Sequence, residues 1–181
     1  MNNRLVWMDL EMTGLDPDRS VIVEIATLVT DSELNVLGQG PNLVISHPES
    51  VLENMEPWSR RHHEASGLLA RIRSSSVSTQ DAQKATLDFL SSLCRAKVCP
   101  LAGNSVWQDR RFLVRYMPAL NDFLHYRIVD VSTVKELVRR WYPHLPAYDK
   151  KNRHTALSDI LESLAELKYY REKVFFPVNA V

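Results

Sequence analysis

The chain has few cysteines, no net charge and no long apolar run, and each shortage excludes a class of protein. Cys94 and Cys99 are too few for a disulfide scaffold and lack the further ligands of a zinc site, so we expect reduced, structural thiols. No apolar run approaches the roughly 18 residues that span a bilayer, and no secretory leader is evident at the N-terminus. We therefore expect a soluble, cytoplasmic protein without a membrane partner.

The balance of charge limits the partners of the protein. With 22 basic and 22 acidic residues, the chain has no net field that would draw it onto long nucleic acid. A nucleic-acid partner is therefore expected to be short or held by few contacts. A hydrophobic content of 45% over 181 residues suits one globular domain, which we expect to cover residues 1–181.

The order of periodic segments predicts an α/β domain on a mixed sheet. Residues 5–15, 22–30 and 36–46 suggest three strands joined by short turns, which favours an antiparallel meander. Helices are expected over residues 58–66 and 79–94. Strands at 98–102 and 126–131 then alternate with helices at 107–117, 133–141 and 154–170, which is typical of parallel strands with helical crossovers.

The first strand ends in two acids, Asp9 and Glu11, separated by one residue. Side chains two residues apart on a strand share a face, so the two carboxylates can converge. Carboxylates held together repel each other unless a cation lies between them, and oxygen ligands suit hard ions such as Mg²⁺ or Mn²⁺. The pair alone is a weak signal, because two solvated acids at a strand end would look the same.

Two further acids and a histidine strengthen the metal hypothesis. Asp109 opens a helix just after a strand, and Asp159 lies in the first turns of the last helix. Four such acids can hold two divalent ions for phosphoryl displacement, although Asp109 and Asp159 could also be helix-start acids favoured by the helix dipole. His154 leads into the last helix and suits a general base at neutral pH.

Three motifs together carry a resemblance to a known family. They are Asp9-Leu-Glu11-Met-Thr-Gly14, Gly103-Asn-Ser-x-x-x-Asp109 and His154-Thr-Ala-Leu-Ser-Asp159. This combination resembles the motifs of the DEDD exonucleases in their histidine-bearing branch. The match is closer still to the members that degrade oligoribonucleotides, because it extends over nearly the whole chain. One departure is Ser158, where many relatives carry a second acid.

The resemblance implies a fold and a reaction. The fold would be ribonuclease H-like, with three antiparallel strands followed by parallel ones and helices on both sides. The activity would be 3′→5′ hydrolysis of short RNA, especially dinucleotides, to 5′-mononucleotides. Asp9, Glu11 and Asp159 would bind one Mg²⁺ or Mn²⁺, Asp9 and Asp109 would support a second, and His154 would activate the attacking water.

The resemblance also implies how the substrate is held. Leu15 and Trp58 would wedge and stack the bases, while Ser105, Arg127, Ser132 and Lys135 would close around the 5′-phosphate. Tyr126 and His63 would reach in from a partner subunit, which requires a homodimer. From the residues alone, Trp58 could instead be a core aromatic, and Tyr126 and Arg127 could be surface residues of an edge strand.

Two other functions remain open from the sequence. One is a related exonuclease that acts on DNA or on RNA 3′ tails, against which the neutral charge argues. The other is a catalytically inactive nucleic-acid-binding module on the same fold. All five positions of the proposed catalytic set carry the expected residue, which argues against an inactive module.

Overall fold

The computed structural model describes residues 3–149 and 155–175 and contains a mixed sheet. The strands are β1 (Leu5–Met12), β2 (Ile22–Thr30), β3 (Val36–Val44), β4 (Leu101–Gly103) and β5 (Ile128–Asp130). They lie in the order β3-β2-β1-β4-β5, and β1 to β3 are antiparallel, whereas β1, β4 and β5 are parallel. The prediction of an antiparallel meander followed by parallel strands is confirmed.

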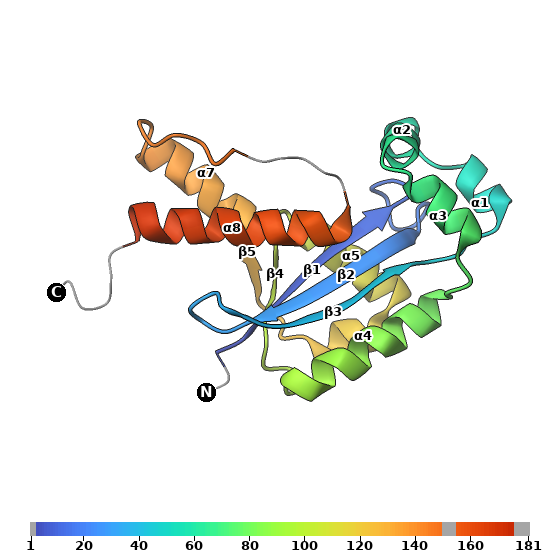
Figure 1. The fold of residues 1–181 in the computed structure, drawn as a ribbon, viewed down its shortest axis with the longest axis horizontal. Coiled ribbons are helices and arrows are strands. Elements are labelled where there is room, and N and C mark those ends of the chain that lie inside the picture. The colour runs from blue at the N-terminus through green and yellow to red at the C-terminus, as the bar shows by residue number, and fades with distance from the viewer. Residues whose placement is uncertain (1–2, 150–154, 176–181) are drawn as a thin grey trace.

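Helices cover both faces of this sheet (Figure 1). α7 and α8 lie on one face, α4, α5 and α6 lie on the other, and α1 to α3 gather beside one end of the sheet. Their bounds are α1 Glu49–Glu53, α2 Pro57–Ala65, α3 Leu68–Ser74, α4 Thr79–Leu93, α5 Trp107–Tyr116, α6 Pro118–Phe123, α7 Val131–Trp141 and α8 Ala156–Val174.

The central strand β1 divides its side chains between two apolar cores. Val6, Met8 and Leu10 pack with α4 and α5, whereas Trp7 packs with α7 and α8. This alternation follows from the two-residue repeat of a strand. Asp9 and Glu11 continue the Trp7 series, so the pleat places both acids on the side that α8 covers.

Prolines account for two differences from the expected elements. β4 begins at Leu101 rather than at residue 98, because Pro100 has no N–H for a strand ladder and Val98 is exposed. Pro118 ends α5 as expected but also begins α6, since the first position of a helix needs no N–H partner.

Three short helices, α1, α3 and α6, were not predicted from the sequence. The expected end of α2 is confirmed, because Gly67 has a φ of +73°, which favours glycine. α3 begins directly after this turn and buries Leu68, Leu69 and Ile72 under the end of the sheet. Its core side chains are too few for a helical repeat to stand out.

Ser158 serves the start of α8. It stands three residues after Thr155, the N-cap, and accepts a hydrogen bond from the Thr155 backbone N–H at 3.3 Å. An acid at this position would complete the same capping box, so serine preserves the helix start. His154 and residues 150–153 lie outside the described part of the chain. Among the described residues, no helix is long and apolar enough to cross a membrane.

Truncation of Leu90 should test the packing of α4 on the sheet. Leu90 is fully buried in the core beside β1 and β3. We expect Leu90→Ala to lower the free energy of unfolding by about 3 kcal/mol through lost contacts and a cavity. Ser91→Ala, on the exposed side of the same helix, should change it by less than about 0.5 kcal/mol in urea unfolding. Equal effects of the two changes would contradict this packing.

Candidate active site

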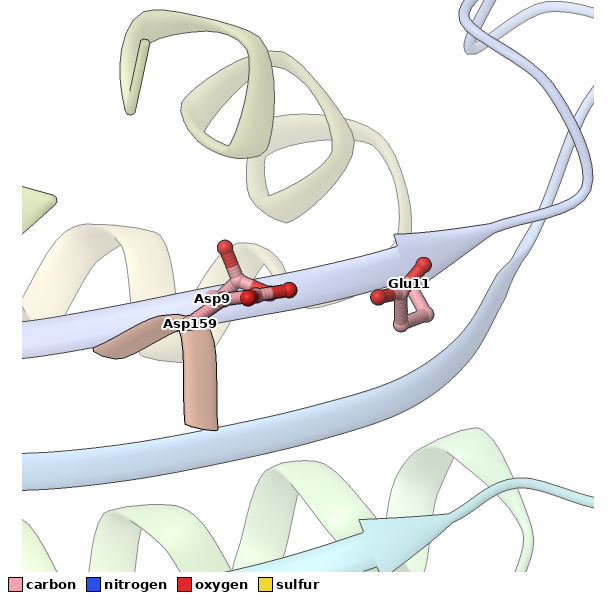
Figure 2. A group of neighbouring side chains, drawn as sticks. All are labelled: Asp9, Glu11 and Asp159. Carbon is pink, nitrogen blue, oxygen red and sulfur yellow. The ribbon is translucent and has the colours of Figure 1, made fainter. Parts of the chain in front are cut away.

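Three carboxylates meet between β1 and the start of α8. Figure 2 shows Asp9 and Glu11 on the same strand, with Asp159 at the first turn of the helix that crosses it. One carboxylate oxygen from each residue lies within 4.8 Å of the other two. The acids are separated by about 150 positions in the sequence, and the crossing of α8 over β1 brings them together.

Asp109 stands at the edge of this group. It lies in the first turn of α5, is buried, and its Oδ1 accepts a hydrogen bond from the Leu10 backbone N–H at 2.9 Å. This N–H is available because β4 ends at Gly103 and the remainder of β1 has no strand on that side. Asp109 is not one of the three acids above, but its charge raises the pKa of Asp9.

Burial and mutual repulsion shift the protonation of these acids. Burial raises the pKa of Asp9 well above its usual value, and the charges of Asp109 and Glu11 add to the shift. Burial also raises the pKa of Glu11 to about 8, with Asp159 as the largest charge effect, and raises that of Asp109 to about 7. In the metal-free protein, the folded state therefore holds protons on acids that would be ionised in water at pH 7.

The donor set fits a divalent cation. Asp9, Glu11 and Asp159 offer only oxygen ligands, which hard ions such as Mg²⁺ and Mn²⁺ prefer. A cation would also remove the repulsion that raises the pKa values of these carboxyl groups. The predicted divalent-metal site is therefore supported in its chemistry, while the geometry does not choose between the two metals.

Glu24 and Arg71 form an ion pair beside this acid group. Glu24 is fully buried on β2, directly across from Glu11, and its Oε1 accepts a hydrogen bond from the Arg71 guanidinium at 2.9 Å. Its Oε2 accepts one from the Ala156 backbone N–H at 3.4 Å. From the sequence, a glutamate inside the apolar run at 22–30 is expected to face either the acids of the first strand or solvent, and the structure places Glu24 towards the acids. The role of Arg71 was missed, because α3 itself was not foreseen.

His63 lies beside Glu11 and Met12, at the end of β1. Its Nε2 donates to the Met12 carbonyl at 2.9 Å, and its Nδ1 is 3.9 Å from the Glu11 carboxylate. Burial lowers the pKa of the ring, which is 2% exposed. Within its own subunit the ring lies beside Glu11, and the expectation that His63 reaches in from a partner subunit stays a prediction.

Leu15 and Trp58 are both exposed apolar residues beside the end of β1. Leu15 is 62% exposed, yet its backbone N–H donates to Glu56 at 3.3 Å and its carbonyl accepts from Gln108 at 2.5 Å. Trp58 is 59% exposed and stacks on His62, with ring centroids 3.7 Å apart, so it is not a core aromatic. Both side chains are available to a ligand.

Ser105 and Ser132 lie together where β4 and β5 end. Their hydroxyl oxygens are 3.1 Å apart, and the Ser105 backbone N–H donates to Asp130 at 2.9 Å. Lys135, one turn further along α7, has its Nζ 3.7 Å from Glu166. Because β1, β4 and β5 are parallel, the C-terminal ends of β4 and β5 lie at the same end of the sheet as the C-terminal end of β1.

Arg127 does not join this cluster within one subunit. It precedes β5 whereas Ser132 follows it, and it lines a cleft of about 450 Å³ with Arg4 and Leu5 at the opposite end of the sheet. Its guanidinium carbon lies 5.5 Å from the centre of the Tyr126 ring, which is 75% exposed. Arg127 and Ser132 thus lie at opposite ends of β5 within one subunit, and the expected phosphate cap of Ser105, Arg127 and Ser132 stays a prediction.

The chain resembles known exonucleases over nearly its whole length. The model of the RNase T exonuclease family matches residues 6–167. The chain belongs to this exonuclease family. An oligoribonuclease from Shewanella loihica is 56% identical over 172 residues, covering 94% of this chain and 95% of the relative. An oligoribonuclease from Vibrio parahaemolyticus is 53% identical over 175 residues, covering 96% and 97%. The prediction of a 3′→5′ exoribonuclease of the oligoribonuclease type is confirmed.

Solved structures support the fold. An exonuclease I from Methylocaldum szegediense superimposes with a TM-score of 0.71 at 19% identity, and covers 94% of this chain but 41% of its own. The zinc-bound exonuclease I complex with single-stranded DNA from E. coli gives 0.72 at 16%, covering 96% and 41%. At these identities the likeness concerns the fold alone, and it confirms the ribonuclease H-like sheet.

The raised pKa values predict how the stability of the metal-free protein depends on pH. Glu11 and Asp109 bind protons more tightly when folded than when unfolded, so their stabilising contribution is complete below about pH 4 and is lost as the pH rises towards 8. The lowered pKa of His63 acts in the opposite direction, but only below about pH 6.5.

Between pH 6.5 and 8.5, we therefore expect the melting temperature in EDTA to fall by roughly 5 °C or more. Mg²⁺ should reverse most of this loss, because it binds the ionised carboxylates, and its stabilising effect should grow with pH. Differential scanning fluorimetry with and without Mg²⁺ measures both effects. A metal-free melting temperature that stays constant or rises over this range would contradict the pKa argument.

Proposed function

We propose that this protein hydrolyses short oligoribonucleotides, especially dinucleotides, from the 3′ end and releases 5′-mononucleotides in a metal-dependent reaction. The observation that carries the proposal is the half-buried group of Asp9, Glu11 and Asp159, whose converging carboxylates favour binding of a cation. The similarity to oligoribonucleases over nearly the whole chain supports the choice of substrate.

Different sets of acids are proposed to bind the two cations. We assign Asp9, Glu11 and Asp159 to one Mg²⁺ or Mn²⁺, and Asp9 with Asp109 to a second. When bound, such ions supply positive charge to the phosphate that is cleaved and to the oxygen that leaves. Asp109 also accepts the Leu10 N–H, so it fixes the end of β1 on which Asp9 and Glu11 stand.

His154 is proposed as the general base that takes a proton from the attacking water. It directly precedes Thr155, the N-cap of α8, and α8 carries Asp159 on its first turn. A neutral imidazole suits this role at pH 7. His63 is a second imidazole near the acids, but its Nε2–H bond to Met12 and its burial suit it to holding Glu11 in place.

The substrate is proposed to lie between Leu15 and Trp58 on one side and a phosphate cap on the other. Ser105, Ser132 and Lys135 supply the cap from one subunit. A cap closes the site behind the second nucleotide, which excludes longer chains by steric clash. This arrangement explains a preference for dinucleotides without any need for net positive charge.

A homodimer is proposed to complete the cap. Arg127 precedes β5 whereas Ser132 follows it, and we propose that Arg127 joins the cap in the homodimer. Its neighbour Tyr126 is 75% exposed, as expected of a side chain that a partner would cover. Arginine suits the grip of a terminal phosphate by two parallel hydrogen bonds. The cytoplasmic location and the single domain over residues 1–181 stay predictions.

The proposed function is tested by the choice of substrate. The purified protein is incubated with Mg²⁺ and equal concentrations of a 5′-phosphorylated diribonucleotide, a longer single-stranded RNA and a matching DNA. We expect mononucleotides to be released from the dinucleotide at least about 10-fold faster than from the other two, with all release abolished by EDTA. Faster cleavage of RNA 3′ tails or DNA would keep the metal chemistry but contradict the phosphate cap.

Asp109→Asn should separate the catalytic charge of this residue from its structural bond. Asparagine keeps an oxygen that can accept the Leu10 N–H but loses the charge that supports a cation. We expect kcat on the dinucleotide to fall by at least about 100-fold. The melting temperature in EDTA at pH 8 should stay the same or rise, because a buried charge is removed.

Asp88→Asn is the matched control, since Asp88 is an exposed acid on α4 that pairs with Lys84. This variant should retain normal kcat. If Asp109→Asn retained more than a tenth of the turnover, Asp109 would have no part in catalysis.

A further inference from the structure

A buried carboxylate on α8 takes no part in the reaction proposed above. Glu166 is fully buried, and its Oε2 accepts a hydrogen bond from the Asn104 side-chain amide at 3.0 Å. Its Oε1 accepts one from the Tyr170 hydroxyl at 2.9 Å and lies 3.7 Å from Lys135 Nζ. A buried charge is tolerated only with such hydrogen-bond and ionic partners. Here two of the partners, Asn104 and Lys135, connect Glu166 to the proposed phosphate cap.

A chain of hydrogen bonds connects Glu166 to Ser105 through the side chains of Asn104 and Ser132. The Asn104 amide nitrogen, which Glu166 accepts from, also donates to Ser163 at 2.7 Å. The Asn104 carbonyl oxygen accepts from the Ser132 hydroxyl at 3.1 Å. Ser132 in turn accepts from the Ser105 backbone N–H at 2.9 Å.

Glu166, at the buried end of this chain, sets the donor-to-acceptor direction of its hydrogen bonds. An amide nitrogen can only donate and an amide oxygen can only accept, so the Glu166 carboxylate determines which way round Asn104 sits. That orientation presents an acceptor to Ser132 and aligns its hydroxyl beside that of Ser105. Lys135 is held towards the same carboxylate by charge.

The same helix carries the ligands of the cation. Asp159, Ser163 and Glu166 are spaced four and three residues apart, which places them on one face of α8. Asp159 and Glu166 are separated by seven residues, or about 10 Å along the axis. In Figure 1, α8 runs across β1 and β4, so one continuous helix spans both the acid group and the cap residues.

We propose that Glu166 is a positioning residue that holds the phosphate cap at a fixed distance from the acid group. Through Asn104 it orients Ser132 and Ser105, and through charge it directs Lys135. Because Glu166 and Asp159 belong to one rigid helix, the cap and the metal ligands keep their separation. This inference rests on the proposed function, since it assumes that the cap receives a 5′-phosphate.

Glu166→Gln provides the first test. The glutamine amide offers one donor where the carboxylate had only acceptors, so it must oppose Asn104, Tyr170 or Lys135. We expect kcat/KM for a 5′-phosphorylated diribonucleotide to fall by about 10-fold or more, with less than about 3-fold change for the same dinucleotide without its 5′-phosphate. The control, Glu172→Gln, makes the same change at an exposed position of α8 and should alter neither value.

A substrate that does not reach the cap separates the two proposals. The p-nitrophenyl ester of thymidine 5′-monophosphate places p-nitrophenolate where the 5′ nucleotide would leave, so its hydrolysis reports on the acid group alone. Glu166→Gln should cleave it at the normal rate. Failure of the unchanged protein to cleave this ester and the dinucleotide would overturn the proposed function. Equal losses on all substrates would show a merely structural role and overturn the inference.

A double substitution keeps the test valid if Glu166→Gln folds poorly. Asn104→Asp alone places two carboxylates in contact and should lose the preference for the 5′-phosphate. In the combination of Asn104→Asp with Glu166→Gln, the glutamine amide can donate to the new aspartate, which restores the complementarity. We expect at least about 3-fold recovery of that preference. Two results would overturn the inference. One is no recovery of the preference in a folded double variant, and the other is a stronger preference of Glu166→Gln for the 5′-phosphorylated dinucleotide.

Discussion

The repulsion among the half-buried carboxylates of the acid group is the constraint on which the rest of the structure depends. Asp9, Glu11 and Asp159 lie close together, and restricted access to water together with mutual repulsion raises the pKa of Asp9 and Glu11. The surroundings hold the acids in place without neutralising all of them. Asp109 fixes the backbone of β1, His63 lies beside Glu11, and the charge of Glu24 is matched by Arg71. The folded chain therefore favours binding of a positive charge at this site, which a divalent ion can supply.

α8 organises the site along its length. Its first turn delivers Asp159 to β1, and its buried face continues through Ser163 to Glu166, which bonds to Asn104 at the end of β4. A helix is stiff over such a span, so the two ends of the site cannot drift apart independently. The acid group and the proposed cap are therefore both anchored on this one helix.

The direction of the strands decides which residues of the proposed cap lie at the same end of the sheet as the acids. The parallel strands β1, β4 and β5 end on the side of the acids, and they bring Ser105 and Ser132 there. Arg127 precedes β5 and therefore lies at the opposite end, beside the exposed Tyr126. Arg127 and Ser132 are thus close in sequence but divided by a strand.

The sequence by itself determined the strand order of the first half, the acids of the three motifs and the family, because strand periodicity and motif spacing are local properties. It placed Glu24 towards either the acids or solvent, and it could not foresee α3 or its Arg71. The tertiary structure alone decided that His63 lies beside Glu11 of its own subunit, that Arg127 is remote from Ser132, and that Glu166 joins Asn104. These relations depend on how helices cross the sheet, and crossing is set by packing between residues far apart in the chain.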